Sequence, residues 1–157
     1  MSTTEAVSFE TTRHVRATCL CLHLQQAARA IARRFDDCLR PTGLTNGQFS
    51  LLMALNRPEP PTMSSVATLL AMDRTTLTAS VKPLERRNLL RVVVDPVDRR
   101  SRRLILTRAG KAALNSAYPL WQREHARLDG LVADPQRVRD DLQALSGTAS
   151  TCDGPNL

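Results

Sequence analysis

The sequence is poor in aromatic residues: Phe, Tyr and Trp together make up 3% of its 157 residues. A core without large rings must be built from Leu, Val and Ala, which favours packed helices over a β-sandwich. Long apolar runs are also missing, because no stretch approaches the roughly 18 apolar residues that a transmembrane helix needs. The opening residues lack the apolar segment of a signal peptide. We therefore expect a cytoplasmic protein without membrane contact.

Glycine is scarce as well, with six in the chain. There is no glycine-rich phosphate loop, no nucleophile elbow and no pair of metal ligands, so the sequence does not predict an enzyme, a cofactor or a metal site. The spacing of the cysteines and histidines fits no common zinc framework: Cys19, Cys21, Cys38, Cys152, His14, His23 and His125. Without an export signal, the cysteines are expected to be thiols rather than disulfides.

Lysine is nearly absent from the basic residues, because 20 of the 22 are Arg. Guanidinium is a planar, permanently charged fork that suits phosphates and guanine edges. Of the net charge of +7, a share of +6 lies between Asp73 and Arg108, where ten basic residues face four acids. This excess runs through one helix-like and one hairpin-like segment. Such charge predicts a surface for DNA, although a basic helix face alone is also compatible with simple solvation.

Apolar residues recur at every third and fourth position from about Arg13 to Leu39, which predicts one long amphipathic helix that ends at Pro41. Residues 1–12 are polar, and we expect them to fray. Thr45 and Gln48 have the spacing of a capping box and predict a short buried helix that ends before Pro58. Two prolines then make residues 59–61 a stiff linker.

Two short helices follow, over residues 64–70 and 74–87, with Asp73 as the expected N-cap of the second. One face of the second helix is apolar and the other is basic, which is the pattern of a helix-turn-helix. Pro83 lies inside this helix, where we expect a bend.

Apolar runs at residues 89–94 and 103–106 predict a β-hairpin with a long, arginine-rich tip. Thr107 is placed to cap a long helix, which Pro119 should kink. Asp134 and Pro135 are typical of the start of a last helix, to about Leu145, followed by a polar tail.

A helix-turn-helix, then a basic hairpin, with a long helix on each side, resembles the MarR family of bacterial winged-helix transcription regulators. The resemblance is carried by Leu70–Thr78 and by Asp98–Arg103, whose Asp98, Arg100 and Arg103 fit the Asp-x-Arg-x-x-Arg pattern of the wing. It implies a mainly α fold with a small β-hairpin wing. The implied domains are a DNA-binding domain over 44–108, a dimerisation region over 13–43 and 109–145, and flexible tails at 1–12 and 146–157.

The expected partner is double-stranded DNA with a roughly palindromic operator, read by a homodimer whose recognition helices enter successive major grooves. The resemblance points to Arg100 as the wing arginine that enters the minor groove, whereas Asp98 should orient a neighbouring arginine. Ser64 and Ser65 suit a phosphate contact, with simple N-capping as an equal alternative. The full set of expected DNA-binding residues is Ser64, Ser65, Arg74, Thr75, Thr76, Thr78, Lys82, Arg86, Arg99, Arg100, Arg102 and Arg103.

The resemblance also implies a small effector, often an aromatic acid or a phenolic compound, between the dimer arm and the winged domain. Five residues are candidates to line that cleft, each with core packing as its alternative: His23, Phe49, Met53, Tyr118 and Trp121. The function expected first is a repressor that such an effector releases from DNA. Activation instead of repression, and a non-specific architectural DNA protein, stay open.

The alternative is the same scaffold as a thiol-based redox, electrophile or metal sensor, with Cys19, Cys21 and Cys38 as candidates. Two apart on an unbroken helix, Cys19 and Cys21 point away from each other and can neither bridge nor chelate together. A disulfide would then have to cross the dimer or recruit Cys152 in the tail. Buried thiols that act as small hydrophobes are the ordinary case.

Overall fold

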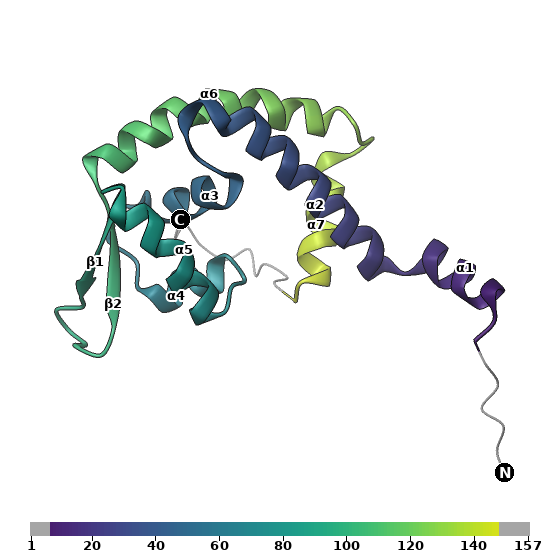
Figure 1. Cartoon of the computed structure of the whole chain (residues 1–157), viewed down its shortest axis with the longest axis horizontal. Coiled ribbons are helices and arrows are strands. Elements are labelled where there is room, and N and C mark those ends of the chain that lie inside the picture. Colours follow the sequence, from purple (N-terminus) through teal and green to yellow (C-terminus); the bar gives the residue numbers. More distant parts are fainter. Residues whose placement is uncertain (1–6, 148–157) are drawn as a thin grey trace, which may run out of the picture. The chain divides into compact units, whose positions relative to one another are not determined.

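The structure is a computed structural model of the chain and describes residues 7–147 (Figure 1). The chain forms two compact units, which divide between Arg34 and Phe35. The first unit holds α1 (Phe9–Thr18), which Ser8 caps, and the beginning of α2 (Leu20–Leu39). The expected single helix from Arg13 is therefore wrong at its start. The helix begins at Phe9, inside the segment expected to fray, and is interrupted at Cys19, whose backbone is extended (φ −68°, ψ 104°).

The second unit begins with the last turn of α2, where Phe35 and Leu39 are buried. A short 3-10 helix, η1 (Arg40–Thr42), follows and ends at Gly43, whose φ of +70° is the left-handed conformation that favours glycine. Helix α3 (Asn46–Leu55) starts with the expected capping box. It is buried along most of its length and forms the centre of the unit.

Helices α4 (Met63–Leu69) and α5 (Arg74–Arg86) form the expected helix-turn-helix. The turn between them contains Ala71 with a φ of +50°. Helix α5 buries an apolar stripe that recurs at three and four residues and is not ended by Pro83: Leu77, Val81 and Leu84. The predicted pairing of a short helix with a second, half-buried helix is confirmed.

Strands β1 (Leu90–Val94) and β2 (Arg102–Leu106) form the expected antiparallel hairpin, in which Leu90 pairs with Leu106 and Val94 with Arg102. The proline linker, predicted only to be stiff, also joins this sheet. The Leu104 N–H donates to the Pro61 carbonyl at 2.9 Å, and Thr62 forms an isolated bridge with Arg103. The segment before α4 is thus hydrogen-bonded to strand β2 of the wing.

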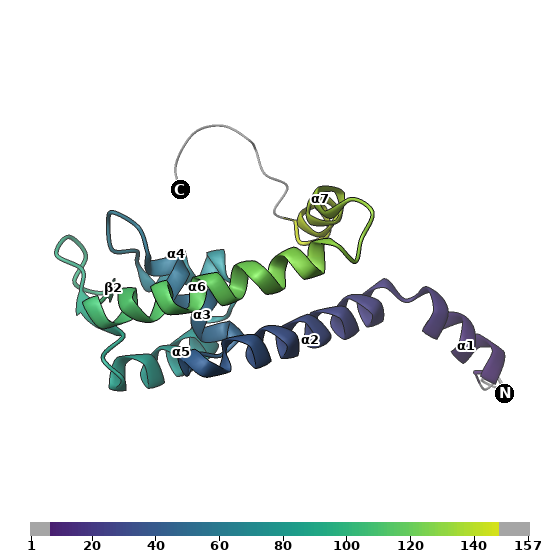
Figure 2. The same cartoon turned by 90° about the horizontal axis from the view of Figure 1, so that it is seen from above.

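Helix α6 (Arg108–Asp129) follows the wing, capped by Thr107, and packs on α3 (Figure 2). Helix α7 (Pro135–Leu145) is capped by Asp134 as expected and buries none of its residues within the single chain. A leucine-rich core fills the second unit: Phe35, Leu39, Leu44, Phe49, Leu51, Leu52, Ala54, Leu55, Val66, Leu77, Val81, Leu84, Leu89, Leu90, Leu104, Leu114 and Ala117. The mainly helical fold with one hairpin is confirmed. No helix within residues 7–147 has the length and apolar character to cross a bilayer.

Candidate nucleic-acid interface

Helix α5 presents a polar and basic face to solvent. The Asp73 carboxylate caps its first turn and accepts from the Thr76 hydroxyl at 2.6 Å and the Thr76 backbone N–H at 2.8 Å. These two hydrogen bonds stabilise the ionised carboxylate and hold the pKa of Asp73 below its ordinary value. The exposed face carries every residue that the sequence assigned to this helix: Arg74, Thr75, Thr76, Thr78, Lys82 and Arg86.

The threonines of this face differ in how their hydroxyls are used. Thr76 donates to Asp73, and Thr78 donates to the Arg74 carbonyl at 2.7 Å, so both retain only acceptor capacity. The Thr75 hydroxyl makes no hydrogen bond within residues 7–147. Thr75 is therefore the member of the trio best placed to donate to a ligand.

The N-terminus of α4 is capped by Thr62, not by either serine. The Thr62 hydroxyl accepts from the Ser65 N–H at 3.1 Å, and the Ser65 hydroxyl donates back to the Thr62 carbonyl at 2.9 Å. The capping alternative for Ser64 and Ser65 is thus wrong, because the helix already begins at Met63 and both serines lie inside its first turn. Both side chains are exposed.

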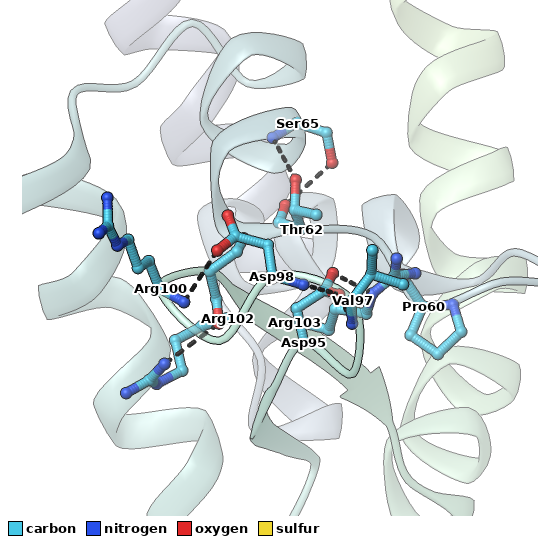
Figure 3. Close-up of polar contacts among 10 residues, drawn as sticks. Pro60, Thr62, Ser65, Asp95, Val97, Asp98, Arg100, Arg102 and Arg103 are labelled. Atoms are coloured by element: carbon cyan, nitrogen blue, oxygen red, sulfur yellow. Dashed lines mark hydrogen bonds and ion pairs between the residues drawn. The ribbon is translucent and has the colours of Figure 1, made fainter.

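The tip of the wing is shaped by two aspartates (Figure 3). The Asp98 carboxylate accepts from the Arg100 backbone N–H at 3.0 Å, and its carbonyl accepts from the Ser101 N–H at 2.9 Å. Asp98 therefore holds the backbone of the neighbouring Arg100, through the N–H of that residue. Arg99, Arg100 and Arg102 are exposed, as expected of residues at the tip.

Arg103 is placed differently from the other wing arginines. Its Nε donates to the Asp95 carboxylate at 2.5 Å and its Nη1 to the Pro60 carbonyl at 3.0 Å, which leaves the side chain 28% exposed. The backbone N–H groups of Val97 and Asp98, and then Arg103, lower the pKa of Asp95. A contact of Arg103 with DNA, as the sequence predicts, would have to compete with these two internal hydrogen bonds.

Sequence reasoning missed Asp95 altogether. The pairing of Asp95 with Arg103 could have been predicted from the hairpin register, in which Val93 pairs with Arg103. Positions 93 and 95 share one face of their strand, which places Asp95 diagonally across from Arg103, within reach of a long side chain.

A cavity of about 280 Å³ lies between α4, the start of α5 and the wing. Ser64, Arg74, Arg100 and Arg102, which are distant in sequence, meet there beside a single acid, Asp98. The remaining lining is Met63, Ala67 and Ser101. Three arginines line this cavity, a composition that suits a phosphate or another anion.

A second hollow, of about 570 Å³, is lined by Phe49, Met53, Tyr118 and Trp121, four of the five effector candidates. Trp121 is the centre of an aromatic stack, with ring centroids 6.1 Å from Phe49 and 6.0 Å from Tyr118. The rest of the lining was not predicted: Ser50, Ala54, Asn56, Arg57, Leu69 and Leu70.

The structure does not group His23 with these residues. It belongs to the first unit, where it lines another hollow with residues of α1, and its Nε2 lies 3.2 Å from the Ala17 carbonyl. Its assignment to the effector cleft came from its position in the sequence alone and stays a prediction.

The thiols differ in environment. Cys19 lies at the break between α1 and α2, and Cys21 is exposed in the first turn of α2. The argument that they point apart assumed an unbroken helix and therefore fails. Burial and the nearby Glu124 carboxylate raise the pKa of Cys38, which favours the protonated, less nucleophilic form of that thiol. Cys152 lies outside the described residues, and residues 7–147 contain no metal-binding group of His, Cys, Asp or Glu.

Comparison with known proteins gives related regulators. Residues 42–101 match the model of the MarR family. The chain is 39% identical to the transcriptional regulator MosR of M. tuberculosis, solved in complex with DNA, over 87% of this chain and 99% of that one, with a TM-score of 0.77. It is 32% identical to the transcriptional repressor CouR, solved on a 23-mer DNA duplex, over 85% and 94% of the two chains, with a TM-score of 0.70. The regulator SarZ of Staphylococcus epidermidis is 26% identical over 124 residues, which cover 79% of this chain and 84% of SarZ.

Proposed function

This chain belongs to the MarR family of transcription regulators, and we propose that it is a homodimeric, sequence-specific repressor of transcription that a small effector releases from DNA. Members of the family are regulators rather than enzymes. The proposal places the protein in the cytoplasm, where a bacterial chromosome lies. The sign of regulation follows CouR, which is a repressor.

The observation that carries the DNA-binding proposal is the convergence of Arg74, Arg100 and Arg102 on the cavity between α4, α5 and the wing. These side chains come from two different DNA-binding elements, helix α5 and the wing. Helix α5 offers an exposed face of hydroxyl and basic groups of the kind that reads base edges in a major groove, with Arg74 at its positively polarised N-terminus. The exposed wing carries arginines that suit the negative potential of a minor groove. The relatives MosR and CouR, both solved on DNA, support this assignment.

The dimer is supported by apolar surface that the single chain leaves exposed. Along α7 and the segment before it, five aliphatic residues are 40–68% exposed: Leu131, Val132, Val138, Leu142 and Leu145. In the first unit, Leu20 is 55% exposed and Ile31 in the same helix is 41% exposed. Apolar faces of this extent on long helices are typical of an interface between copies. A two-fold dimer would present two α5 helices to one palindromic site.

The effector proposal rests on the hollow around Trp121. Its walls are mostly apolar and aromatic, and Arg57 and Asn56 supply polar groups among them. A site of this make-up suits a planar aromatic ligand with an anionic or hydrogen-bonding substituent. Because α6 carries Tyr118 and Trp121 and leads toward α7, a ligand there can favour one spacing of the two recognition helices over another.

One selection experiment tests the DNA-binding proposal. The wild-type protein is used to enrich duplexes from a random-sequence library, and the enriched duplex is then competed against the starting pool at physiological salt. We expect a roughly palindromic consensus, bound about a thousandfold more tightly than random DNA. Sedimentation of the free protein should give a dimer. Failure to enrich any sequence, with folded dimer in hand, would refute sequence-specific binding and leave the architectural alternative.

A thiol switch is the second candidate, and the break at Cys19 favours it. Interruption of the helix at Cys19 removes the regular helical geometry that would hold the Cys19 and Cys21 thiols on opposite sides. With hydrogen peroxide as the oxidant, two thiols would give one disulfide and two waters. Peroxide titration of DNA binding, repeated with Cys19→Ser and Cys21→Ser, separates the two mechanisms: a peroxide response that either serine abolishes supports the switch, and an unaltered response in both variants contradicts it.

A further inference from the structure

The side chain of Arg103 lies near the tip end of the hairpin strands, between the hairpin and the proline linker (Figure 3). One of its nitrogens donates to the Asp95 carboxylate at 2.5 Å and another to the Pro60 carbonyl at 3.0 Å. Asp95 itself is a side chain with 5% exposure. Arg103 therefore uses two of its five N–H donors within the protein, on partners 8 and 43 residues away in the sequence.

The Asp95 carboxylate continues the connection toward the tip. It accepts from the Val97 N–H at 2.8 Å and from the Asp98 N–H at 3.1 Å. Asp98 in turn accepts from the Arg100 N–H at 3.0 Å. An unbroken series of hydrogen bonds thus runs from the linker, through Arg103 and the two aspartates, to the backbone of Arg100.

On its other side, the backbone around Arg103 fixes the start of α4. Pro61 accepts from the Leu104 N–H at 2.9 Å, and Thr62, the N-cap of α4, bridges to Arg103. Helix α4 supplies Ser64 to the arginine-lined cavity, and the wing supplies Arg100 and Arg102. Arg103 is therefore the point at which the two walls of that cavity are joined.

We propose that Arg103 and Asp95 form a clamp that positions the wing relative to α4, and that Arg103 is a positioning residue and not a DNA ligand. The inference deepens the proposed function and rests on it. A guanidinium that is already paired with a buried carboxylate has little charge left for a phosphate, and its Nε and Nη1 are both committed to protein acceptors. The planar fork of arginine serves two acceptors from two nitrogens at fixed angles, whereas a lysine ammonium donates from a single nitrogen, which cannot occupy the Nε and the Nη1 positions at once.

The clamp and a direct phosphate contact predict opposite changes in DNA affinity for Asp95→Asn. If Arg103 bound phosphate, removal of the Asp95 charge would free it and strengthen binding to DNA. If Arg103 positions the wing, loss of its ionised partner weakens binding. Glu59→Gln is the matched control, because it removes one negative charge from the neighbouring exposed linker without touching the clamp.

The measurement is a binding titration with the duplex that the wild-type protein enriches from a random library, together with a stoichiometric titration that gives the active fraction of each variant. We expect Asp95→Asn and Arg103→Lys to bind about fivefold or more weakly, which is the lower end of the loss when a groove-reading side chain is removed. Glu59→Gln should bind as tightly as wild type or slightly more tightly. Asp95→Asn that binds as tightly as wild type would overturn the clamp.

Hydroxyl-radical footprinting at saturating protein separates positioning from general loss of structure. Arg103→Lys should lose protection at the same nucleotides that Arg100→Ala loses, and keep the protection given by α5. A separate set of nucleotides, lost only in the Arg103 variant, would identify a direct contact and refute the proposal. If Asp95→Asn does not fold, Arg103→Lys, which retains the charge, decides the question alone.

The failure of this inference is distinguishable from the failure of the proposed function. If wild-type protein enriches no duplex, the function itself is wrong. If it enriches one and Asp95→Asn retains wild-type affinity for it, only the clamp is wrong.

Discussion

Gly110 occupies the point where α6 meets the base of the wing, and it tests how closely these elements are packed. A Cβ atom at this position would lie 2.1 Å from the Leu89 carbonyl oxygen and 2.7 Å from Leu106 Cδ1. The Leu89 carbonyl belongs to the backbone and accepts from the Thr107 N–H at 3.1 Å, so it cannot turn aside like a flexible side chain. Gly110→Ala must therefore displace the first turn of α6 from the wing.

The size of the effect follows from three contributions. Glycine to alanine within a helix ordinarily stabilises by about 1 kcal/mol. Here the added methyl group overpacks a closed site, at a cost of about 1–3 kcal/mol, and weakens the hydrogen bond to Leu89, worth about 0.5–1.5 kcal/mol. The net expectation is a loss of about 1–3 kcal/mol in the free energy of unfolding, opposite in sign to the helix propensity.

Gly47→Ala supplies the matched control, because Gly47 lies in the first turn of α3, and a methyl group added there would have no heavy atom of the described residues within 4 Å. Urea unfolding at one fixed protein concentration, followed by far-ultraviolet circular dichroism, gives both free energies. Gly47→Ala should be unchanged or more stable by up to about 1 kcal/mol. If Gly110→Ala is as stable as wild type, the close approach of α6 to the wing is wrong.

The other predictions concern DNA, pH and the effector. Arg100→Ala should weaken binding to the enriched duplex by about 1–3 kcal/mol and leave the dimer intact in sedimentation; unchanged affinity would remove the wing from the interface. Backbone N–H groups and an arginine hold the pKa of Asp95 in the folded protein below its ordinary value. The ionised Asp95 therefore stabilises the fold above the ordinary carboxyl pKa, and this stabilisation is lost as the pH falls through the lower pKa of the folded state. The urea midpoint of Asp95→Asn should accordingly lie below that of wild type at neutral pH and approach it below about pH 4, and a constant difference would contradict the linkage. Benzoate should change the fluorescence of Trp121, the single tryptophan, and Arg57→Gln should bind it several-fold more weakly, by about 1 kcal/mol or more; equal affinity in the two proteins would exclude Arg57 from carboxylate recognition.

Local signals in the sequence were sufficient to predict most of the helices and the hairpin. Thr45 with Gln48, Asp73, Thr107 and Asp134 each cap the helix that they were expected to cap. Such caps act within one turn, through side chains three residues from the groups that they bind, so the chain's order alone reveals them. The fold class and the family followed from the same signals.

Two other local expectations failed, one because no residue type marks the event and one because several residues of the capping type stand close together. The break at Cys19 contains neither glycine nor proline, and α4 begins at Met63 because Thr62, not a serine, caps it. Both features change a functional interpretation. The break at Cys19 means that the two thiols do not share one regular helix, and the cap at Thr62 leaves Ser64 and Ser65 without a capping role.

What the sequence determined by itself is the charge of this protein, its helical elements and the two basic segments that face solvent, because these depend on composition and on spacing within a few residues. What only the tertiary structure decided is how those segments are divided among roles. Arg100 and Arg102 meet Arg74 at a cavity, whereas Arg103, one position further along, turns inward to Asp95 and Pro60. That difference depends on the strand register and on a linker some forty residues earlier in the chain. Contacts at such separation are set when the core packs, and no local pattern in the sequence encodes them.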